Sequence, residues 1–218
     1  MIIKRLIHLG LVCVTGLLLA CNAKPEFAAL PKGANVLVLG DSLSYGTGAA
    51  KGEDYVSLLA VNTQWQLINA GVPGNTSADG LQRLPSLLEA YHADESKVDL
   101  LIVELGGNDF LRQMPEAETR NNLKAILQQA KANQIQAVLL AIPEFSPIGA
   151  AFGSLSDHEL YAALAKETGT PLIEDIFSEV LAKNALKSDA IHPNAQGYKK
   201  VEESLRKALE KLGFLKKQ

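Results

Sequence analysis

The sequence predicts an α/β protein, a three-layer α/β/α sandwich around a mostly parallel sheet. Short continuous apolar runs alternate along the chain with longer segments in which apolar residues recur every three or four positions. The first pattern is typical of strands buried on both faces, and the second of amphipathic helices. Strands joined by helices run parallel, and the helices then cover both faces of the sheet. The length of 218 residues suits one such domain, and no shift in composition marks another.

Five apolar runs supply the expected strands. They lie at residues 36–39, 66–70, 98–105, 135–142 and 172–173. Gly40 ends the first run and Pro143 the fourth, while residues 71–75 form a loop dense in turn formers. The third run, which ends in Gly106-Gly107-Asn108-Asp109, gives the strongest strand signal.

The expected helices follow the strands. They lie at 53–61, from Thr76 or Ser77 through Leu88, at 116–133, from Ser156 onward, and at 194–212. Their inner faces are predicted from the apolar spacing, as Tyr55, Leu58, Leu59 and Val61; Leu81, Leu84, Leu87 and Leu88; Leu123, Ile126, Leu127 and Ala130; and Tyr198, Val201, Leu205 and Leu209. Ser156 with Glu159 matches a capping box, which would begin the helix there.

The N-terminal segment has the features of an export signal. Lys4 and Arg5 precede an apolar stretch at 7–19, and Leu18-Leu19-Ala20-Cys21 closes it. This end resembles the lipobox of bacterial lipoproteins, in which the cysteine is acylated and becomes the new N-terminus. We therefore expect a signal peptide at 1–20, a lipidated Cys21 with a tether at 21–34, and a folded domain at 35–218. An ordinary secretory signal, giving a soluble periplasmic or secreted protein, is the alternative.

The resemblance to lipoproteins also implies a location in the bacterial cell envelope. Asn22 is not the aspartate that is linked to inner-membrane retention in enteric bacteria, so the outer membrane or its periplasmic face is favoured. The formal net charge of −3 shows no bias toward nucleic acid. After Cys21 the chain has no cysteine, which excludes disulfides, zinc–thiolate sites and cysteine catalysis in the domain.

Ser42 is the candidate nucleophile, because it comes directly after the first predicted strand, where open α/β sheets place their ligands. A helix-capping role is the other interpretation of Asp41-Ser42. A serine nucleophile needs a base and an orienting acid. His192 with Asp189, three residues upstream, can supply them from the loop before the last helix. His92 and His158 are expected at the surface, His158 within the capping box.

Four short motifs occur in order along the chain. They are Gly-Asp-Ser-Leu at 40–43, Asn-Ala-x-x-x-Gly at 69–74, Val-Glu-Leu-Gly-Gly-Asn-Asp at 103–109 and Asp-x-x-His-Pro at 189–193. Together they resemble the SGNH (GDSL-type) hydrolase family, and within it the bacterial group of multifunctional acyl-thioesterases, arylesterases and lysophospholipases. The resemblance covers the chain from about residue 35 to residue 212 and implies a flavodoxin-like sheet.

The resemblance assigns roles to individual residues. It makes Ser42 the nucleophile, His192 the general base and Asp189 the group that orients the imidazole. The backbone N–H groups of Ser42 and Gly74 and the side-chain amide of Asn108 would form the oxyanion hole. Loops at the carboxyl ends of neighbouring strands can converge on one carbonyl oxygen, which agrees with this assignment.

Two carboxylates are expected to do other work. Asp41 should brace the loop beside Ser42, and Glu104 should be a buried hydrogen-bonding residue within its strand.

The expected activity is hydrolysis of carboxylic esters and thioesters through an acyl-enzyme, without metal or cofactor. Apolar residues in two loops favour an acyl chain as the substrate group, namely Phe110, Leu111, Met114, Phe145, Ile148 and Phe152. A carbohydrate or peptidoglycan O-acetylesterase is the alternative enzyme, and a binding module on the same fold is the alternative without catalysis. The expected partners are a small acyl substrate and a membrane reached through the lipid anchor, with no nucleic acid and no metal.

Overall fold

The sheet is parallel throughout the part of the chain that the structure describes. A computed structural model describes residues 27–93, 97–144 and 154–216. Their strands are β1 (Asn35–Gly40), β2 (Gln66–Gly71), β3 (Leu100–Glu104), β4 (Gln136–Leu140) and β5 (Leu172–Ile173). They form one five-stranded sheet in the order β2-β1-β3-β4-β5. The predicted α/β fold with a flavodoxin-like strand order is confirmed.

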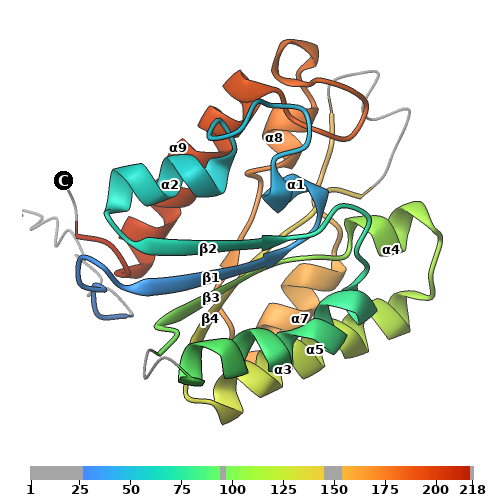
Figure 1. The fold of residues 1–218 in the computed structure, drawn as a ribbon. Helices are drawn as coiled ribbons and strands as arrows, with labels where there is room; N and C mark the ends of the chain where they lie inside the picture. The colour runs from blue at the N-terminus through green and yellow to red at the C-terminus, as the bar shows by residue number, and fades with distance from the viewer. Residues whose placement is uncertain (1–26, 94–96, 145–153, 217–218) are drawn as a thin grey trace, which may run out of the picture.

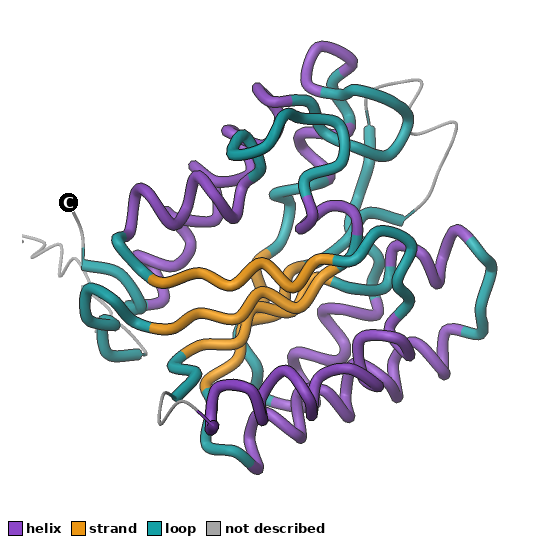
Figure 2. Tube along the Cα trace, in the orientation of Figure 1, coloured by secondary structure: helices purple, strands orange, loops and turns teal. Residues whose placement is uncertain are grey.

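Helices cover both faces of the sheet and complete the three layers (Figures 1 and 2). On one face lie α2 (Tyr55–Thr63) and α9 (Ala195–Leu212), and on the other α3 (Ser77–Ala93), α5 (Glu116–Ala132) and α7 (Leu160–Thr168). Short helices follow three of the loops, namely α1 (Ser42–Tyr45), α4 (Gly107–Leu111) and α8 (Ser178–Leu181), and a 3₁₀ turn spans Asn184–Leu186.

The core has its centre at β1 and β3. Every residue of β3 is buried, and so are Val36 to Leu39 of β1, as expected for strands covered on both faces. The predicted stripe on α5 is buried, as is the one on α9. These two amphipathic helices therefore pack their apolar faces onto the sheet from opposite sides.

Two expectations about helix detail are wrong. The helix after the 154–159 segment begins at Leu160, and Ser156 does not cap it, because the Ser156 carbonyl accepts the Glu144 N–H at 2.9 Å in a pairing of two extended segments. Glu159 is the N-cap and makes no capping hydrogen bond through its side chain, whereas the Leu160 N–H is accepted by His158 Nδ1 at 3.2 Å. Val61 is 79% exposed, because the buried face of α2 runs through Tyr55, Val56 and Leu59 instead.

The strand order creates a crevice at one end of the sheet. The chain leaves β1 for β2 on one side and later enters β3 on the other, so β1 and β3 flank the point where the direction of winding reverses. Ser42 follows β1 and Asn108 follows β3, which brings both to the carboxyl ends of the central strands. The predicted site therefore lies where ligands bind in open α/β sheets.

The predicted signal peptide, Cys21 and three of the proposed substrate residues (Phe145, Ile148 and Phe152) lie outside the described residues. Within the ranges that are described, no helix is both long and apolar enough to cross a membrane.

Candidate active site

Ser42 begins a single helical turn directly after β1. Asp41 caps this turn, accepting the Leu43 N–H on its carboxylate at 2.9 Å, and Gly46 ends it in a left-handed conformation. The turn is packed tightly against β2, because a Cβ at Gly71 would lie 2.3 Å from the Tyr45 backbone nitrogen. Asp41 thus braces the loop, as expected, and Ser42 is held at the first position of a short, well-fixed helix.

His192 reaches Ser42 from the other end of the chain. Its Nε2 lies 3.0 Å from Ser42 Oγ, and its Nδ1 lies 2.8 Å from Asp189 Oδ2. The other oxygen of Asp189 accepts the backbone N–H groups of Ile191 and His192, at 2.9 and 2.8 Å. This single turn fixes the carboxylate relative to the imidazole, so the structure brings Ser42, His192 and Asp189 into one hydrogen-bonded chain.

The loop that carries His192 is itself anchored. Asn194 caps α9 by accepting the Gly197 N–H at 3.0 Å, and its amide donates to the Ala185 and Lys187 carbonyls at 2.9 and 3.2 Å. Partial desolvation raises the pKa of Asp189, but the hydrogen bonds from Ile191 and His192 outweigh it and leave that pKa below its usual value. Asp189 therefore stays ionised while it holds the imidazole.

The three predicted oxyanion donors lie on the loops that follow β1, β2 and β3. Among the described residues, the backbone N–H groups of Ser42 and Gly74 have no hydrogen-bond acceptor. Gly74 has φ of +81°, a conformation that favours glycine. The Asn108 amide donates to Asp41 Oδ2 at 3.0 Å and to the Asn75 carbonyl at 2.9 Å, which ties the loops after β1, β2 and β3 together. The predicted oxyanion-hole residues are therefore clustered on neighbouring loops.

The glycines before Asn108 allow this approach. Gly106 has φ of +118°, and a Cβ there would lie 2.3 Å from the hydroxyl oxygen of Tyr161. That hydroxyl donates to the Leu105 carbonyl at 2.8 Å, which holds the end of β3 against α7. A side chain at position 106 would therefore displace the backbone that carries Asn108.

A cavity of about 270 Å³ opens beside Ser42. Its walls include Leu43, Leu111, Ile142, Pro143, Leu155, Leu181 and Ile191 with Ser42, Asn108 and His192. Of the three predicted substrate residues that the structure describes, Leu111 lies on this wall. Phe110 stacks on His158 with ring centroids 4.2 Å apart, and neither Phe110 nor Met114 lines the cavity.

Sequence reasoning missed Ile142 and Leu181 as wall residues. Leu181 belongs to α8, which is too short to show a helical period, and Ile142 is the last residue of a run that was interpreted only as strand. Pro143 ends that run and marks the point where the backbone leaves the sheet beside the site. It was the signal in the sequence that could have indicated Ile142 as a wall residue.

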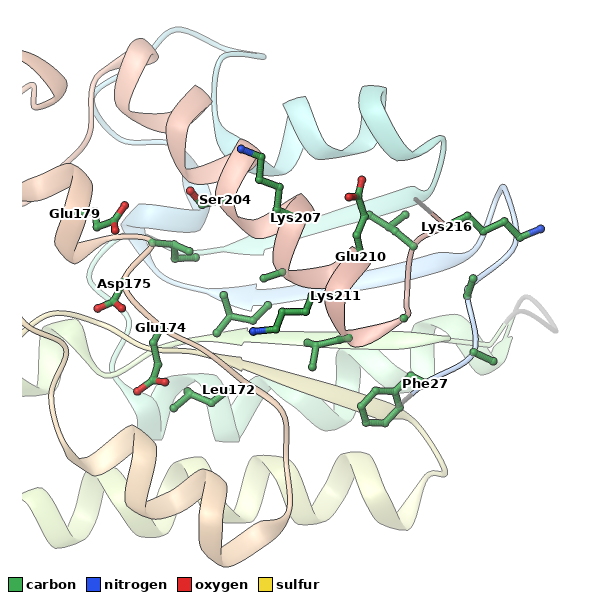
Figure 3. A pocket seen from close by; sticks show the side chains of 18 residues that line it. Phe27, Leu172, Glu174, Asp175, Glu179, Ser204, Lys207, Glu210, Lys211 and Lys216 are labelled. Atoms are coloured by element: carbon green, nitrogen blue, oxygen red, sulfur yellow. The ribbon is translucent and has the colours of Figure 1, made fainter. Parts of the chain in front are cut away.

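A larger groove of about 1190 Å³ lies between β5 and α9 (Figure 3). Phe27 lies at one end of it, and its rim carries charges of both signs, including Glu174, Lys207 and Lys211. None of the described residues that line this groove is a histidine. Although this groove is larger than the cavity beside Ser42, it is not the candidate site, because the described residues of its lining offer no histidine to act as a base for its single serine, Ser204.

No cluster of three or more His, Cys, Asp or Glu side chains within the described ranges is arranged to hold a metal ion. The chemistry that the clustered groups offer is that of a serine with an imidazole base and nearby N–H donors.

Comparisons with known proteins agree with this geometry. The chain is 34% identical over 182 residues to the thioesterase 1/protease 1/lysophospholipase L1 of Escherichia coli K12, covering 81% of this chain and 84% of that protein. It is 34% identical over 167 residues to esterase TesA of Pseudomonas aeruginosa, covering 72% and 79% of the two chains. The structure of the psychrotrophic esterase EstA from Pseudoalteromonas sp. superposes with a TM-score of 0.68 at 27% identity, covering 81% of this chain and 97% of that one.

The family model described as the GDSL-like lipase/acylhydrolase family matches residues 38–200, a range that begins within β1 before Ser42 and extends beyond His192. The chain therefore belongs to the GDSL-like lipase/acylhydrolase family.

Proposed function

We propose that the protein hydrolyses carboxylic esters and thioesters through an acyl-enzyme formed on Ser42. The observation that carries this proposal is the chain of contacts from Ser42 Oγ to His192 Nε2 at 3.0 Å and from His192 Nδ1 to Asp189 at 2.8 Å. Relatives that are named as thioesterase, lysophospholipase, esterase and arylesterase support the same class of reaction.

The reaction begins with proton transfer from Ser42 Oγ to His192 Nε2 as the oxygen attacks the acyl carbonyl. The imidazolium that forms is stabilised by the ionised Asp189. The carbonyl oxygen becomes an anion and takes hydrogen bonds from the N–H groups of Ser42 and Gly74 and from the Asn108 amide. His192 then donates its proton to the departing alkoxide or thiolate, which leaves the acyl group on Ser42.

Hydrolysis of the acyl-enzyme repeats these steps with water. His192 removes a proton from water, the hydroxide attacks the acyl carbonyl, and the proton returns to Ser42 Oγ as the carboxylic acid leaves. The apolar wall formed by Leu111, Ile142, Leu155 and Leu181 suits the hydrocarbon part of an acyl group. This lining favours an acyl ester over an acetylated sugar.

A fluorophosphonate probe tests the nucleophile directly. The probe should label the wild type and fail to label Ser42→Ala, while a variant at the exposed Ser86 on α3 should be labelled as the wild type is. Labelling that persists in Ser42→Ala would contradict the assignment. The hydrolysis rates of p-nitrophenyl esters of graded chain length, an acyl thioester and an acetylated glycan then separate the acyl hydrolase from the O-acetylesterase alternative.

We also propose that Cys21 is acylated and anchors the domain to the cell envelope. The Phe27 N–H donates to the Leu212 carbonyl at 3.0 Å, and the Phe27 ring stacks on Phe214 at 4.6 Å. Phe27, the first described residue, is thus held against the domain six positions after Cys21, a length of chain that reaches at most about 20 Å. Phe27 lies toward the amino ends of the strands (Figure 3) and Ser42 follows the carboxyl end of β1, so an anchored domain would present its site away from the anchor.

Labelling cells with radioactive palmitate tests the anchor. The wild-type protein should incorporate label and Cys21→Ser should not. Equal incorporation in both would contradict acylation at this residue.

A further inference from the structure

Glu104 is the last residue of β3 and is completely buried. One of its oxygens, Oε2, accepts the Ser44 hydroxyl at 2.6 Å, the Ser44 N–H at 3.0 Å and the Asp41 N–H at 3.3 Å. The other oxygen, Oε1, is equally buried and has no hydrogen-bond donor among the described residues. An ionised carboxylate would leave this oxygen unsatisfied, which is costly in the interior of a protein.

A proton on Oε1 explains why, within the described ranges, Oε2 has three hydrogen-bond donors and Oε1 has none. The protonated oxygen is a donor and needs no donor of its own, while Oε2 acts as the carbonyl oxygen that accepts three hydrogen bonds. Asp41 is the acceptor nearest to hand, because its backbone N–H donates to Glu104 Oε2 at 3.3 Å and a hydrogen bond with the Glu104 side chain lowers the pKa of Asp41. Asp41 is 2% exposed, so the two carboxyl groups form a pair that is closed off from water.

The other contacts of Asp41 lead to the candidate oxyanion hole. Its Oδ2 accepts one hydrogen of the Asn108 amide at 3.0 Å, and the second hydrogen goes to the Asn75 carbonyl at 2.9 Å. An oxyanion that enters the site must share one of these hydrogens. The neutral Asn75 carbonyl is the weaker competitor, so the bond to the charged Asp41 persists and keeps the amide plane turned toward the oxyanion.

We propose that Glu104 and Asp41 form a proton-sharing carboxyl pair that positions the Asn108 amide for the oxyanion, with Glu104 as the proton donor and Asp41 as the carboxylate. The expected effects of this pair on kcat rest on the proposed function, whereas the position of the proton does not. Glu104 and Asp41 are positioning residues, since they act on the substrate through Asn108.

The electrostatics support a single negative charge on the pair. Burial raises the pKa of Glu104 well above its usual value, and the neighbouring charge of Asp41 raises it further. Burial also raises the pKa of Asp41, to about 6, against the hydrogen bond from Leu43 and the charge of His192. The other titratable groups that act on the pair are Arg83, Tyr55, Tyr161 and Tyr198. Two full charges so close together would repel each other.

Infrared difference spectra at neutral pH test where the proton resides. The wild type should show the carbonyl band of a protonated carboxylic acid, and E104Q should lack it. The band should remain in D41N, because burial keeps Glu104 neutral without its partner, and in E118Q, a matched control at an exposed glutamate on α5. A wild type without the band overturns the proposal. Loss of the band in D41N also overturns it, because the proton would then reside on Asp41.

Kinetics on an ester substrate test the positioning role. E104A removes the donor to Asp41 and should lower kcat by roughly tenfold or more with little change in KM, as expected for loss of a hydrogen bond to a charged group. E104Q should recover most of that loss, because its amide oxygen accepts from Ser44 while its NH₂ group donates to Asp41. Equal losses in E104Q and E104A, in proteins that both fold, would overturn the proposal.

A pH series separates positioning from a merely structural role. The ratio of wild-type kcat to D41N kcat should be largest at pH 8 and fall toward one below about pH 6, where Asp41 gains a proton, because the titration of His192 largely cancels in the ratio. A ratio that does not change with pH would overturn the role of the Asp41 charge. If the wild type hydrolyses no ester or thioester, the proposed function fails while the infrared assignment still stands or falls by its own bands.

Discussion

Two carboxylates hold two polar side chains of the candidate active site, and they do so in opposite environments. Asp189 holds His192 from a loop where its own side chain is 52% exposed, whereas Asp41 holds Asn108 from a position that is 2% exposed. Three N–H groups of the 189–192 turn surround Asp189 and lower its pKa overall. Burial instead raises the pKa of Asp41.

The difference follows from what each carboxylate must stabilise. In the proposed reaction His192 gains a positive charge, so an ionised partner is an advantage whenever that charge is present. In the proposed reaction Asn108 faces an oxygen that becomes negative, so a charge on Glu104 in addition to that on Asp41 would oppose the reaction. The proton that we place on Glu104 limits this repulsion. It keeps the pair at a single negative charge, and the neutral acid donates a hydrogen bond to the Asp41 carboxylate that carries it. The same residue type thus serves two purposes through its surroundings.

The largest expected effect in this comparison is at Asp189. Asp189→Ala leaves His192 without its charged partner and without the group that fixes its tautomer. We expect kcat on an ester to fall by about 10⁴-fold, with KM changed much less. The neutral Asp189→Asn should also lose most of the activity. Activity near that of the wild type in either variant would show that His192 is oriented by other contacts.

Asn108→Ala should have a smaller effect. It removes one of three donors to the oxyanion, and we expect a loss of about 10²–10³-fold in kcat with KM nearly unchanged. Asn108→Asp should be at least as damaging because it places a charge where another must form. Circular dichroism should show that both variants are folded. A wild-type kcat in the alanine variant would mean that Asn108 serves only to join the loops through Asp41 and Asn75.

The regular elements of this fold could be predicted from the sequence, because their patterns are local. The stripe at Leu123, Ile126, Leu127 and Ala130 is buried as its spacing predicts. Helix α8 contains only four residues and has no detectable period, so Leu181 could not be placed at the site.

Contacts between distant segments were the harder part of the prediction. The order of the motifs placed Ser42, Asn108 and His192 on neighbouring loops. The bond from Asn108 to Asp41 joins residues 67 positions apart, and the Glu104–Asp41 pair depends on the packing of β1 against β3. The sequence predicted the burial of Glu104 but not its partner. The capping box at Ser156 was wrong because that residue pairs with Glu144 across a short bridge.

The smallest expected effect concerns stability, and it has opposite signs for the two carboxylates. The pKa of Asp41 is raised on folding from 3.8 to about 6, so the folded protein binds more protons than the unfolded chain in this range. The stability that Asp41 contributes is present below pH 3.8 and is lost as pH rises through 6. The difference in free energy of unfolding between wild type and D41N should therefore fall by at most about 3 kcal/mol between pH 4 and pH 7.

Asp189 should behave in the reverse way. Its pKa is lowered on folding, so its contribution is present above its usual pKa and is lost as the solution becomes more acidic. The difference in free energy of unfolding between wild type and D189N should rise as the pH increases through the usual pKa of an aspartate. The rise should be smaller than the fall expected for Asp41, because the Asp189 side chain is exposed to solvent. Urea unfolding followed by the fluorescence of Trp65, the single tryptophan, measures both differences. If both differences in free energy of unfolding change with pH in the same direction, folding does not shift the pKa values of the two carboxylates in opposite directions. The contrast between Asp41 and Asp189 would then be wrong.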